Sequence, residues 1–364
     1  MKKKKPTKKS IKKPQSRLNV MHAWWNKRRL WQKILLVLLV IILVFFSSLY
    51  AMSVWYRLKH QNEPLRYGVT FSEPYARYYD LDPKDTLNDL MTDLNIKNIR
   101  LMSYWSDIEA ERGTYDFSSL DWQFDMVEKN GGNVSLAIGL RQPRWPECHS
   151  PEWAKNQPIE VIYPELERFM GAVVQRYKDR PSLISYQLEN EFFLDVFGRC
   201  PDHSRERLVK EYEFVKKLDP DTPIIVSLSN NYLGIPVGKP QPDQFGVSVY
   251  KRVYDANITK RYFEYPFTSW WYGGRAGWTE LFTGKSSMLH ELQAEPWAPM
   301  PIKEASIEEQ SKSMDAERLR ERIAYGEATG LRDIYLWGGE WWHWRKEKLN
   351  DPSLWSAVKE ELAQ

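Results

Sequence analysis

The sequence predicts an α/β protein, a (β/α)8 TIM barrel preceded by a single N-terminal transmembrane helix. Two observations carry this prediction. From Arg66 onward apolar strand-like runs alternate with amphipathic helical stretches, and one long uncharged run precedes them. Strand–helix alternation is typical of a parallel sheet, and eight such units in about 300 residues suit a closed barrel. A doubly wound sheet, the alternative, would usually carry a glycine-rich turn after the first strand, but residues 69–80 contain no glycine.

The N-terminal part of the chain has the pattern of a membrane anchor. Residues 1–33 are basic and of low complexity, which predicts a disordered cytoplasmic tail. The 21 residues from Ile34 to Val54 carry no charge and match the thickness of a bilayer core. We therefore assign a transmembrane signal-anchor to 34–55 and a short linker to 56–65.

The charge asymmetry around this run predicts its orientation. Lys and Arg are in excess on its N-terminal side, which places the N-terminus in the cytoplasm and the body outside a single-pass cell membrane protein. Tryptophans flank the run, as at membrane interfaces: Trp24, Trp25, Trp31 and Trp55. A signal peptide cleaved near Ser53 is the alternative.

The bulk charges and the cysteines limit the classes of partner. Residues 1–60 hold 15 Lys and Arg and no acidic residue, so the remainder has 37 basic against 48 acidic residues. An acidic body argues against a nucleic-acid partner. Cys148 and Cys200 lie in predicted loops and would be able to bridge in an oxidising compartment, a question left open here. Neither has metal-ligand spacing, and we expect no metal or other cofactor. The sequence makes no prediction about oligomeric state.

A single domain, 66–364, accounts for the rest of the chain. Its eight strands are predicted at 66–71, 97–104, 133–140, 183–190, 223–229, 245–250, 286–293 and 333–338. Helices are expected at 84–94, 118–130, 162–178, 204–218, 303–329 and 352–362, with a poorly defined one within 260–282. Asp82-Pro83 and Asp351-Pro352 are helix start signals, because proline suits a first helical position. Only the connection between the fifth and sixth strands lacks a helical pattern.

Polar residues at the predicted strand ends indicate where the chemistry lies. In a barrel of this type the active site forms at the C-terminal ends of the strands, so these residues should converge. They are Arg100, Arg141, Asn190, Glu191, Tyr250, His290, Glu291 and Trp337. Hydrolysis of a glycosidic bond needs one acid and one carboxylate, and Glu191 and Glu291 end strands four and seven. No Ser-His-Asp set can be assembled from strand ends, which argues against an esterase or protease.

The two carboxylates are expected to have different environments. Arg100 would hold Glu291 ionised, since a nearby cation lowers a carboxyl pKa, and Tyr250 would help by donating a hydrogen bond. Glu191 precedes Phe192 and Phe193, apolar surroundings that raise a pKa toward the acid role.

Three stretches resemble the retaining glycoside hydrolases of clan A. These are "YQLENEF" at 186–192, "MLHELQAEPW" at 288–297, and residues 99–140, which are similar to the second βα unit of family 42 β-glycosidases. "ENE" is also similar to family 35 β-galactosidases. The resemblance implies a retaining hydrolase of β-linked glycans, with Glu191 as acid/base and Glu291 as nucleophile. Asn190 would then hydrogen-bond the sugar 2-hydroxyl.

The resemblance also implies substrate contacts. Arg100 and Tyr250 would orient Glu291, and Trp337 would form the floor of the subsite for the attacked sugar. Arg141 would bind a substrate hydroxyl or fix a loop. Trp145 is one of eight candidate stacking platforms, with Trp105, Trp153, Trp270, Trp271, Trp341, Trp342 and Trp344, and helix packing is the alternative for each. The substrate would be an oligo- or polysaccharide. The activity would be either β-galactosidase-like or, as in family 5, endo-glucanase- or mannanase-like.

Several alternatives stay open at this point. Glu295 and Glu340 compete with Glu291 for the nucleophile role. Glu189 and His290 should point away from their neighbours Asn190 and Glu291 by strand alternation, which predicts a structural ion pair and a neutral packed ring. A membrane-anchored barrel that binds glycans without cleaving them is the competing class of function.

Overall fold

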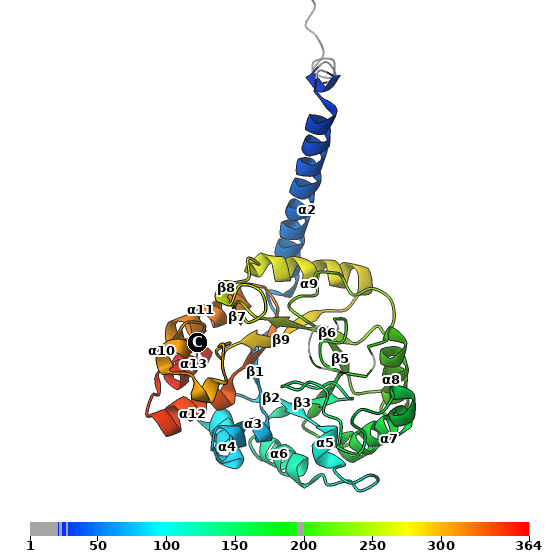
Figure 1. Cartoon of the computed structure of the whole chain (residues 1–364), viewed down its shortest axis with the longest axis vertical. Helices are drawn as coiled ribbons and strands as arrows, with labels where there is room; N and C mark the ends of the chain where they lie inside the picture. The colour runs from blue at the N-terminus through cyan, green and yellow to red at the C-terminus, as the bar shows by residue number, and fades with distance from the viewer. Residues whose placement is uncertain are drawn as a thin grey trace, which may run out of the picture. The chain divides into compact units, whose positions relative to one another are not determined.

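Eight parallel strands close into a barrel surrounded by helices (Figure 1). The structure is a computed structural model that describes residues 21, 24–26, 28–194, 198, 200–201 and 203–363. Around the barrel the strands follow the order β1-β10-β9-β6-β5-β4-β3-β2. Their bounds are β1 Arg66–Thr70, β2 Asn98–Met102, β3 Asn133–Ile138, β4 Leu183–Leu188, β5 Ile224–Leu228, β6 Gln244–Val249, β9 Ser287–Gln293 and β10 Asp333–Trp337. The predicted (β/α)8 fold is confirmed.

The helices of the outer layer follow the predicted pattern with local differences. They are α3 Glu73–Tyr78, α4 Pro83–Thr92, α5 Trp105–Ile108, α6 Ser118–Lys129, α7 Ile159–Tyr177, α8 Arg205–Leu218, α9 Ser269–Thr283, α10 Ile307–Ser311, α11 Ala316–Glu327, α12 Gly339–Leu349 and α13 Ser353–Leu362. Within the described residues, no helix connects β5 and β6, as expected.

The predicted helix at 303–329 is three shorter elements, η1 Ile302–Glu304, α10 and α11. Ser306 and Asp315 interrupt it, because each side chain accepts a backbone hydrogen bond as an N-cap and starts a new helix. An antiparallel hairpin, β7 Arg252–Asp255 and β8 Arg261–Glu264, was not predicted. Among the described residues its two strands pair with each other and with no barrel strand.

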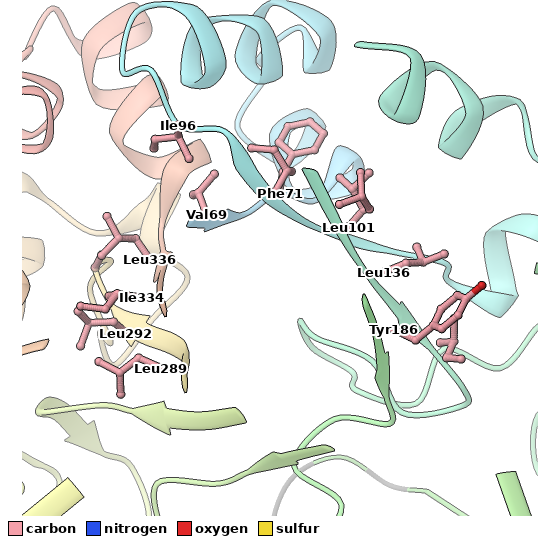
Figure 2. Packing of buried hydrophobic residues seen from close by; sticks show 14 of the residues in the cluster. Val69, Phe71, Ile96, Leu101, Leu136, Tyr186, Leu289, Leu292, Ile334 and Leu336 are labelled. Atoms are coloured by element: carbon pink, nitrogen blue, oxygen red, sulfur yellow. The ribbon is translucent and has the colours of Figure 1, made fainter. Parts of the chain in front are cut away.

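The core lies between the strands and the helices. Figure 2 shows part of it, with Leu289, Leu292, Ile334 and Leu336 from β9 and β10, and Val69, Leu101 and Leu136 from β1, β2 and β3. Each of these seven side chains is fully buried. Alternate residues of the same strands, such as Arg100 between Ile99 and Leu101, are left for the barrel interior.

The N-terminal helix α2 spans Leu30–His60 and is the one helix in the described chain that is long and apolar enough to cross a membrane. The helix starts within the predicted tail, whose first 20 residues lie outside the described residues. The chain divides into two compact units at Ser48 and Leu49, so the last turns of α2 belong to the unit that contains the barrel. Residues 56–60 are therefore helix and not linker.

These last turns of α2 pack closely on α9. A Cβ added at Gly274 would lie 2.3 Å from the carbonyl oxygen of Leu49, and one at Gly277 would lie 2.7 Å from that of Met52. The Tyr56 hydroxyl donates to the carbonyl of Ser287 at 3.1 Å, at the start of β9. His60 bonds to Glu280 at 2.8 Å. Close backbone approach through glycine, together with buried polar contacts, makes this end of α2 part of the barrel's outer layer.

A buried ion-pair network ties the end of β4 to β3 and α8. The Glu189 carboxylate accepts hydrogen bonds from the backbone of Leu140 and Arg141 at 2.8 and 2.9 Å. Arg207 donates to Glu189 at 2.9 Å and to Glu211 at 2.5 Å. Gly139 is required here, since a Cβ at this residue would lie 2.4 Å from the Glu189 carboxylate. Glu189 is thus the structural ion pair that strand alternation predicted.

Glu189→Ala is expected to lower the free energy of unfolding by about 3 kcal/mol, because it leaves two backbone N–H groups and part of a buried guanidinium without their acceptor. Urea unfolding followed by tryptophan fluorescence measures this loss. Glu213→Ala, at a side chain that is 63% exposed, is the matched control and should change stability by no more than about 0.5 kcal/mol. Equal effects of the two changes would contradict the structural role of Glu189.

Candidate active site

Glu291, at the C-terminal end of β9, is held between a cation and a phenol. Arg100 Nη1 donates to Glu291 Oε1 at 2.8 Å, and the Tyr250 hydroxyl donates to Glu291 Oε2 at 2.9 Å. Burial and the charges of Glu291 and Glu191 raise the pKa of Tyr250 well above its usual value, so the phenol keeps its proton. Both partners stabilise the ionised form of Glu291.

The Arg100 guanidinium connects three strand ends. It is fully buried and donates from Nε to Gln187 at 2.6 Å and from Nη2 to the Asn190 amide oxygen at 3.0 Å. Gln187 donates to the same amide oxygen at 2.9 Å. Residues from β2, β4 and β9 thus meet around one cation, as the strand-end argument predicted.

Glu191 lies in the opposite electrostatic environment. Burial raises its pKa to about 8, and the charges of Glu291 and Glu147 add to the shift, which the Ser248 and Ser229 hydroxyl groups only partly offset. Its backbone N–H donates to the Ser227 hydroxyl at 2.9 Å. At neutral pH Glu191 is therefore mostly protonated, which is the state a general acid needs.

The turn that presents Asn190 and Glu191 has a strained backbone. Glu189 and Glu191 have φ values of 54° and 47°, in the left-handed region that disfavours residues with a side chain. Such strain costs on the order of 1 kcal/mol or more per residue and persists where surrounding contacts enforce it. The Glu189 network described above supplies those contacts, so the fold fixes the direction of the Glu191 side chain.

The strand register explains the position of His290. The pairing of β6 with β9 shifts between Val247 and Ser248, which pair with Leu289 and Glu291. His290 is the extra residue of this bulge, so it does not simply alternate with Glu291 as expected. Its ring contacts Tyr335 and Gly246, and burial lowers its pKa well below the usual value, as does the charge of Arg100. The neutral packed form that we expected fits these contacts.

The competing carboxylates belong to a second cluster. Arg144 pairs with Glu295 at 2.5 Å and with Glu340 at 3.1 Å. The Trp337 indole donates to Glu295 at 2.8 Å, and its ring lies 4.0 Å from the Arg144 guanidinium carbon. Glu295 and Glu340 thus share Arg144 as their cationic partner, whereas Arg100 is the cationic partner of Glu291.

A cavity of about 740 Å³ lies beside this second cluster. Neither Glu191 nor Glu291 lines it, but Glu295 and Trp297 do, and the Trp297 ring packs against Tyr250 at 5.4 Å. The other lining residues are largely aromatic or apolar, including Tyr75, Tyr78, Tyr104, Trp145, His149 and Met300. The volume and the aromatic walls suit several sugar rings of a glycan.

The predicted stacking tryptophans differ in their exposure. Trp105, Trp341 and Trp342 are fully buried, and Trp344 is nearly so, so these four pack in the core and are not platforms. Trp153 is half-buried and donates to the Glu109 carbonyl. Trp270 and Trp271 lie on α9. Trp145 is 76% exposed at the cavity and is available to a ligand.

Arg141 is almost fully buried in the wall of the site. Its Nη1 donates to the Leu194 carbonyl at 3.1 Å, and its Nε lies 3.6 Å from Glu147. Glu147, Arg144 and the serine hydroxyl groups near Glu191 were not predicted, because they lie in loops or carry no periodic signal. Cys148 was the one sequence feature that pointed to the loop containing Glu147. It forms a disulfide with Cys200 and so holds this loop.

One group of possible metal ligands lies outside the site. Asp89, His343 and Glu347 come close together in the described chain. Lys346 already pairs with Asp89 at 3.5 Å and with Glu347 at 2.9 Å, which places a cation of the protein among these carboxylates.

Comparison with solved structures shows which class of protein shares this fold. A β-galactosidase from Rahnella sp. R3 gives a TM-score of 0.54 at 13% identity, covering 82% of this chain and 55% of that one. An endo-β-1,4-xylanase of family 10 from Gloeophyllum trabeum also gives 0.54 at 13% identity, covering 83% and 97%. The chain therefore shares the (β/α)8 barrel fold with these two proteins.

Sequence comparisons give more specific matches over parts of the chain. The family 42 model, described as β-galactosidase, matches residues 82–162. β-Galactosidase BgaH of Haloferax lucentense is 29% identical over 152 residues, 35% of this chain and 23% of that protein. A probable mannan endo-1,4-β-mannosidase F of Aspergillus flavus is 30% identical over 101 residues, 27% and 19%. The chain therefore matches less than a quarter of the length of either relative.

These findings confirm the predicted resemblance to clan A glycoside hydrolases of the family 42 and family 5 type. The match at 82–162 includes all of residues 99–140, the stretch similar to the second βα unit. It ends before Glu191 and Glu291.

Removal of the ionisable group at position 191 should change how stability depends on pH. Between the usual carboxyl pKa of 4.5 and about 8, the folded state keeps a proton that the unfolded state releases, so rising pH costs stability. Glu191→Gln is therefore expected to gain stability relative to the wild type between about pH 5 and pH 8.5, on the order of 3 kcal/mol.

Urea midpoints at the two pH values measure this gain. Glu206→Gln, at a side chain that is 77% exposed, should track the wild type. Parallel curves for Glu191→Gln and the wild type would show that the Glu191 pKa is not raised.

Proposed function

We propose that this protein is a membrane-anchored retaining glycoside hydrolase that cleaves β-linked glycans by double displacement. The observation that carries the proposal is the contrast between two neighbouring carboxyl groups. Glu291 is held by Arg100 and Tyr250, which favour its anion, whereas burial and the nearby carboxylates keep Glu191 protonated. A retaining mechanism needs one carboxyl group of each kind, facing one sugar.

The first step forms a covalent intermediate. The Glu291 carboxylate attacks the anomeric carbon while the bond to the leaving oxygen breaks, and Glu191 gives its proton to that oxygen. The Glu291 charge is then lost in the glycosyl ester. Since that charge helps to raise the pKa of Glu191, the pKa falls, and Glu191 becomes a base.

The second step releases the sugar. Glu191 takes a proton from a water molecule whose oxygen attacks the anomeric carbon, and the ester bond breaks to restore the Glu291 carboxylate. The sugar keeps its β configuration. This role requires a separation of about 5–5.5 Å between the two carboxyl groups, in contrast to about 6.5–9.5 Å in inverting enzymes.

The remaining predicted residues have proposed roles in binding. Asn190 meets the 2-hydroxyl group, and Arg100 and Tyr250 orient Glu291. Trp337 forms the floor of the subsite for the attacked sugar. Its indole donates to Glu295 and its ring lies near Arg100, so it stands between the carboxylates and the cavity. Trp145 stacks on a further sugar ring, and Arg141 supports the site wall. The substrate is a β-hexoside of the kinds that the matched β-galactosidases and mannosidases are named for.

Covalent trapping tests the assignment of the nucleophile. A panel of aryl β-glycosides and β-glucans identifies a substrate, and a 2-fluoro analogue of it should label Glu291, as read by peptide mass spectrometry. Glu191→Gln and Glu291→Gln should each lose at least about 10³-fold in kcat/KM while binding is kept.

Glu295→Gln is the matched control. In this variant Glu291 should still be labelled, because the Glu295 carboxylate pairs with Arg144. Label on Glu295 or Glu340 would overturn the nucleophile. An absence of turnover with intact binding across the panel would favour the non-catalytic glycan-binding barrel.

We also propose that α2 is retained as a single-pass anchor, with the N-terminus in the cytoplasm and the barrel outside. The packing of Leu49 and Met52 on the α9 glycines supports retention. A signal peptidase cut near Ser53 would remove part of this packing and break a continuous helix. Tyr56 and Gly330 lie by the starts of β9 and β10, so α2 meets the barrel at the end opposite the carboxylates.

The full-length chain should stay in membranes after an alkaline carbonate wash and keep its N-terminus, as shown by intact mass. Gly274→Leu should lower the melting temperature of the barrel because its side chain would displace α2. Ala51→Leu adds a side chain on the exposed side of α2 and should be neutral. A mature N-terminus just after Ser53 would contradict retention.

A further inference from the structure

A third buried carboxyl group lies beside the proposed acid and nucleophile. Glu147 lies in the loop between β3 and α7, and its side chain is 16% exposed. Its Oε2 accepts a hydrogen bond from Asn190 Nδ2 at 3.0 Å. Burial raises the pKa of Glu147 to about 7; the bond from Asn190 and the charge of Arg141 lower it, and the charge of Glu291 raises it. Burying such a group costs free energy and suggests a use beyond stability.

The chain holds Glu147 in place at some cost. Its φ of 71° lies in the left-handed region, although it is not glycine. The next residue, Cys148, is bonded to Cys200, which follows the Asn190-Glu191 turn in sequence. Gln142 donates from its backbone to the Glu147 carbonyl at 2.8 Å. A Cβ at Gly198 would lie 2.8 Å from the Glu147 Cβ, so the two segments are in close contact.

These contacts determine which way the Asn190 amide points. Its oxygen accepts from Arg100 at 3.0 Å and Gln187 at 2.9 Å, and its nitrogen donates to Glu147. A flipped amide would set N–H groups against two donors and its oxygen against a carboxylate. The amide nitrogen has two N–H groups, and among the described residues Glu147 is the acceptor for one. The other N–H group has no acceptor among these residues.

We propose that Glu147 is a positioning residue that determines specificity at carbon 2 of the sugar. It orients the Asn190 amide so that an N–H group, and not the oxygen, meets the substituent at carbon 2. The site therefore selects β-glycosides that carry a hydroxyl oxygen there and discriminates against 2-deoxy glycosides. This inference rests on the proposed function, because it uses the sugar position assigned to Asn190.

A pair of substrates separates this role from a merely structural one. The aryl β-glycoside that the wild type hydrolyses best is compared with its 2-deoxy analogue. The contact with the 2-hydroxyl group strengthens in the transition state, so the wild type should favour the hydroxylated substrate by about 10²-fold or more in kcat/KM. Glu147→Met removes the acceptor and should lower kcat/KM about 10- to 100-fold for the hydroxylated substrate, with the 2-deoxy value changed by less than about threefold.

Four further variants sharpen the result. Asn190→Ala should show the same selective loss, and the double variant should be no worse than Asn190→Ala, because the two residues act as one unit. Glu147→Gln keeps an acceptor oxygen and should recover part of the preference; it carries the test if Glu147→Met does not fold. Glu152→Met, at a side chain that is 84% exposed, should behave as the wild type. Equal slowing of both substrates by Glu147→Met, or multiplying losses in the double variant, would overturn the proposal.

The outcome is distinguishable from failure of the proposed function. Turnover by the wild type tests the function, and the ratio between the two substrates tests Glu147. If the wild type turns over no glycoside, calorimetry with a polyhydroxylated piperidine and its analogue lacking the corresponding hydroxyl group makes the same comparison on binding. A selective loss of affinity for the hydroxylated compound in Glu147→Met supports the positioning role. Absence of binding by either compound to the wild type would overturn this inference together with the function.

Discussion

The site depends on one fully buried guanidinium group. An unpaired charge in the interior of a barrel would cost several kcal/mol, so the position of Arg100 is tolerable only because Glu291, Gln187 and Asn190 surround it. The same contacts hold the ends of β2, β4 and β9 together. One ion pair thus links the strand ends and gives Glu291 a buried cationic partner.

The chemical asymmetry of the site follows from this placement. Arg100 pairs with Glu291, while the charges that act most strongly on Glu191 are those of Glu291 and Glu147. Three carboxyl groups near one another cannot all ionise at their ordinary pKa. Burial and these charges raise the pKa of Glu191, and the strained turn at Glu189 and Glu191 holds its side chain in place.

The last turns of α2 and the proposed reaction centre lie at different ends of the barrel. The last turns of α2 pack against α9 and reach the start of β9 through Tyr56, whereas the carboxylates lie where the strands end. Glycines on α9 permit this contact because any larger side chain would meet the backbone of α2.

Much of the fold and of the proposed site was predictable from local patterns. Apolar runs of strand length located all eight barrel strands, and the rule that sites lie at strand ends selected Arg100, Tyr250 and Glu291. Glu147 and Arg144 were not predicted as site residues, because a loop has no regular periodicity from which the direction of a side chain can be inferred. For Trp341 and Trp342 the sequence left core packing and sugar stacking open, because an aromatic residue looks the same in sequence in either role, and the structure buries both.

By itself the sequence determined the barrel, the apolar span and the two carboxylates, since each follows from periodicity, length or position within one strand. The strand-end rule paired Arg100 with Glu291, and the structure has this ion pair. Only the tertiary structure showed that Arg144, a loop residue, is the partner of Glu295 and Glu340. Pairing between them depends on distances across the barrel, which arise only when strands far apart in sequence close into one ring.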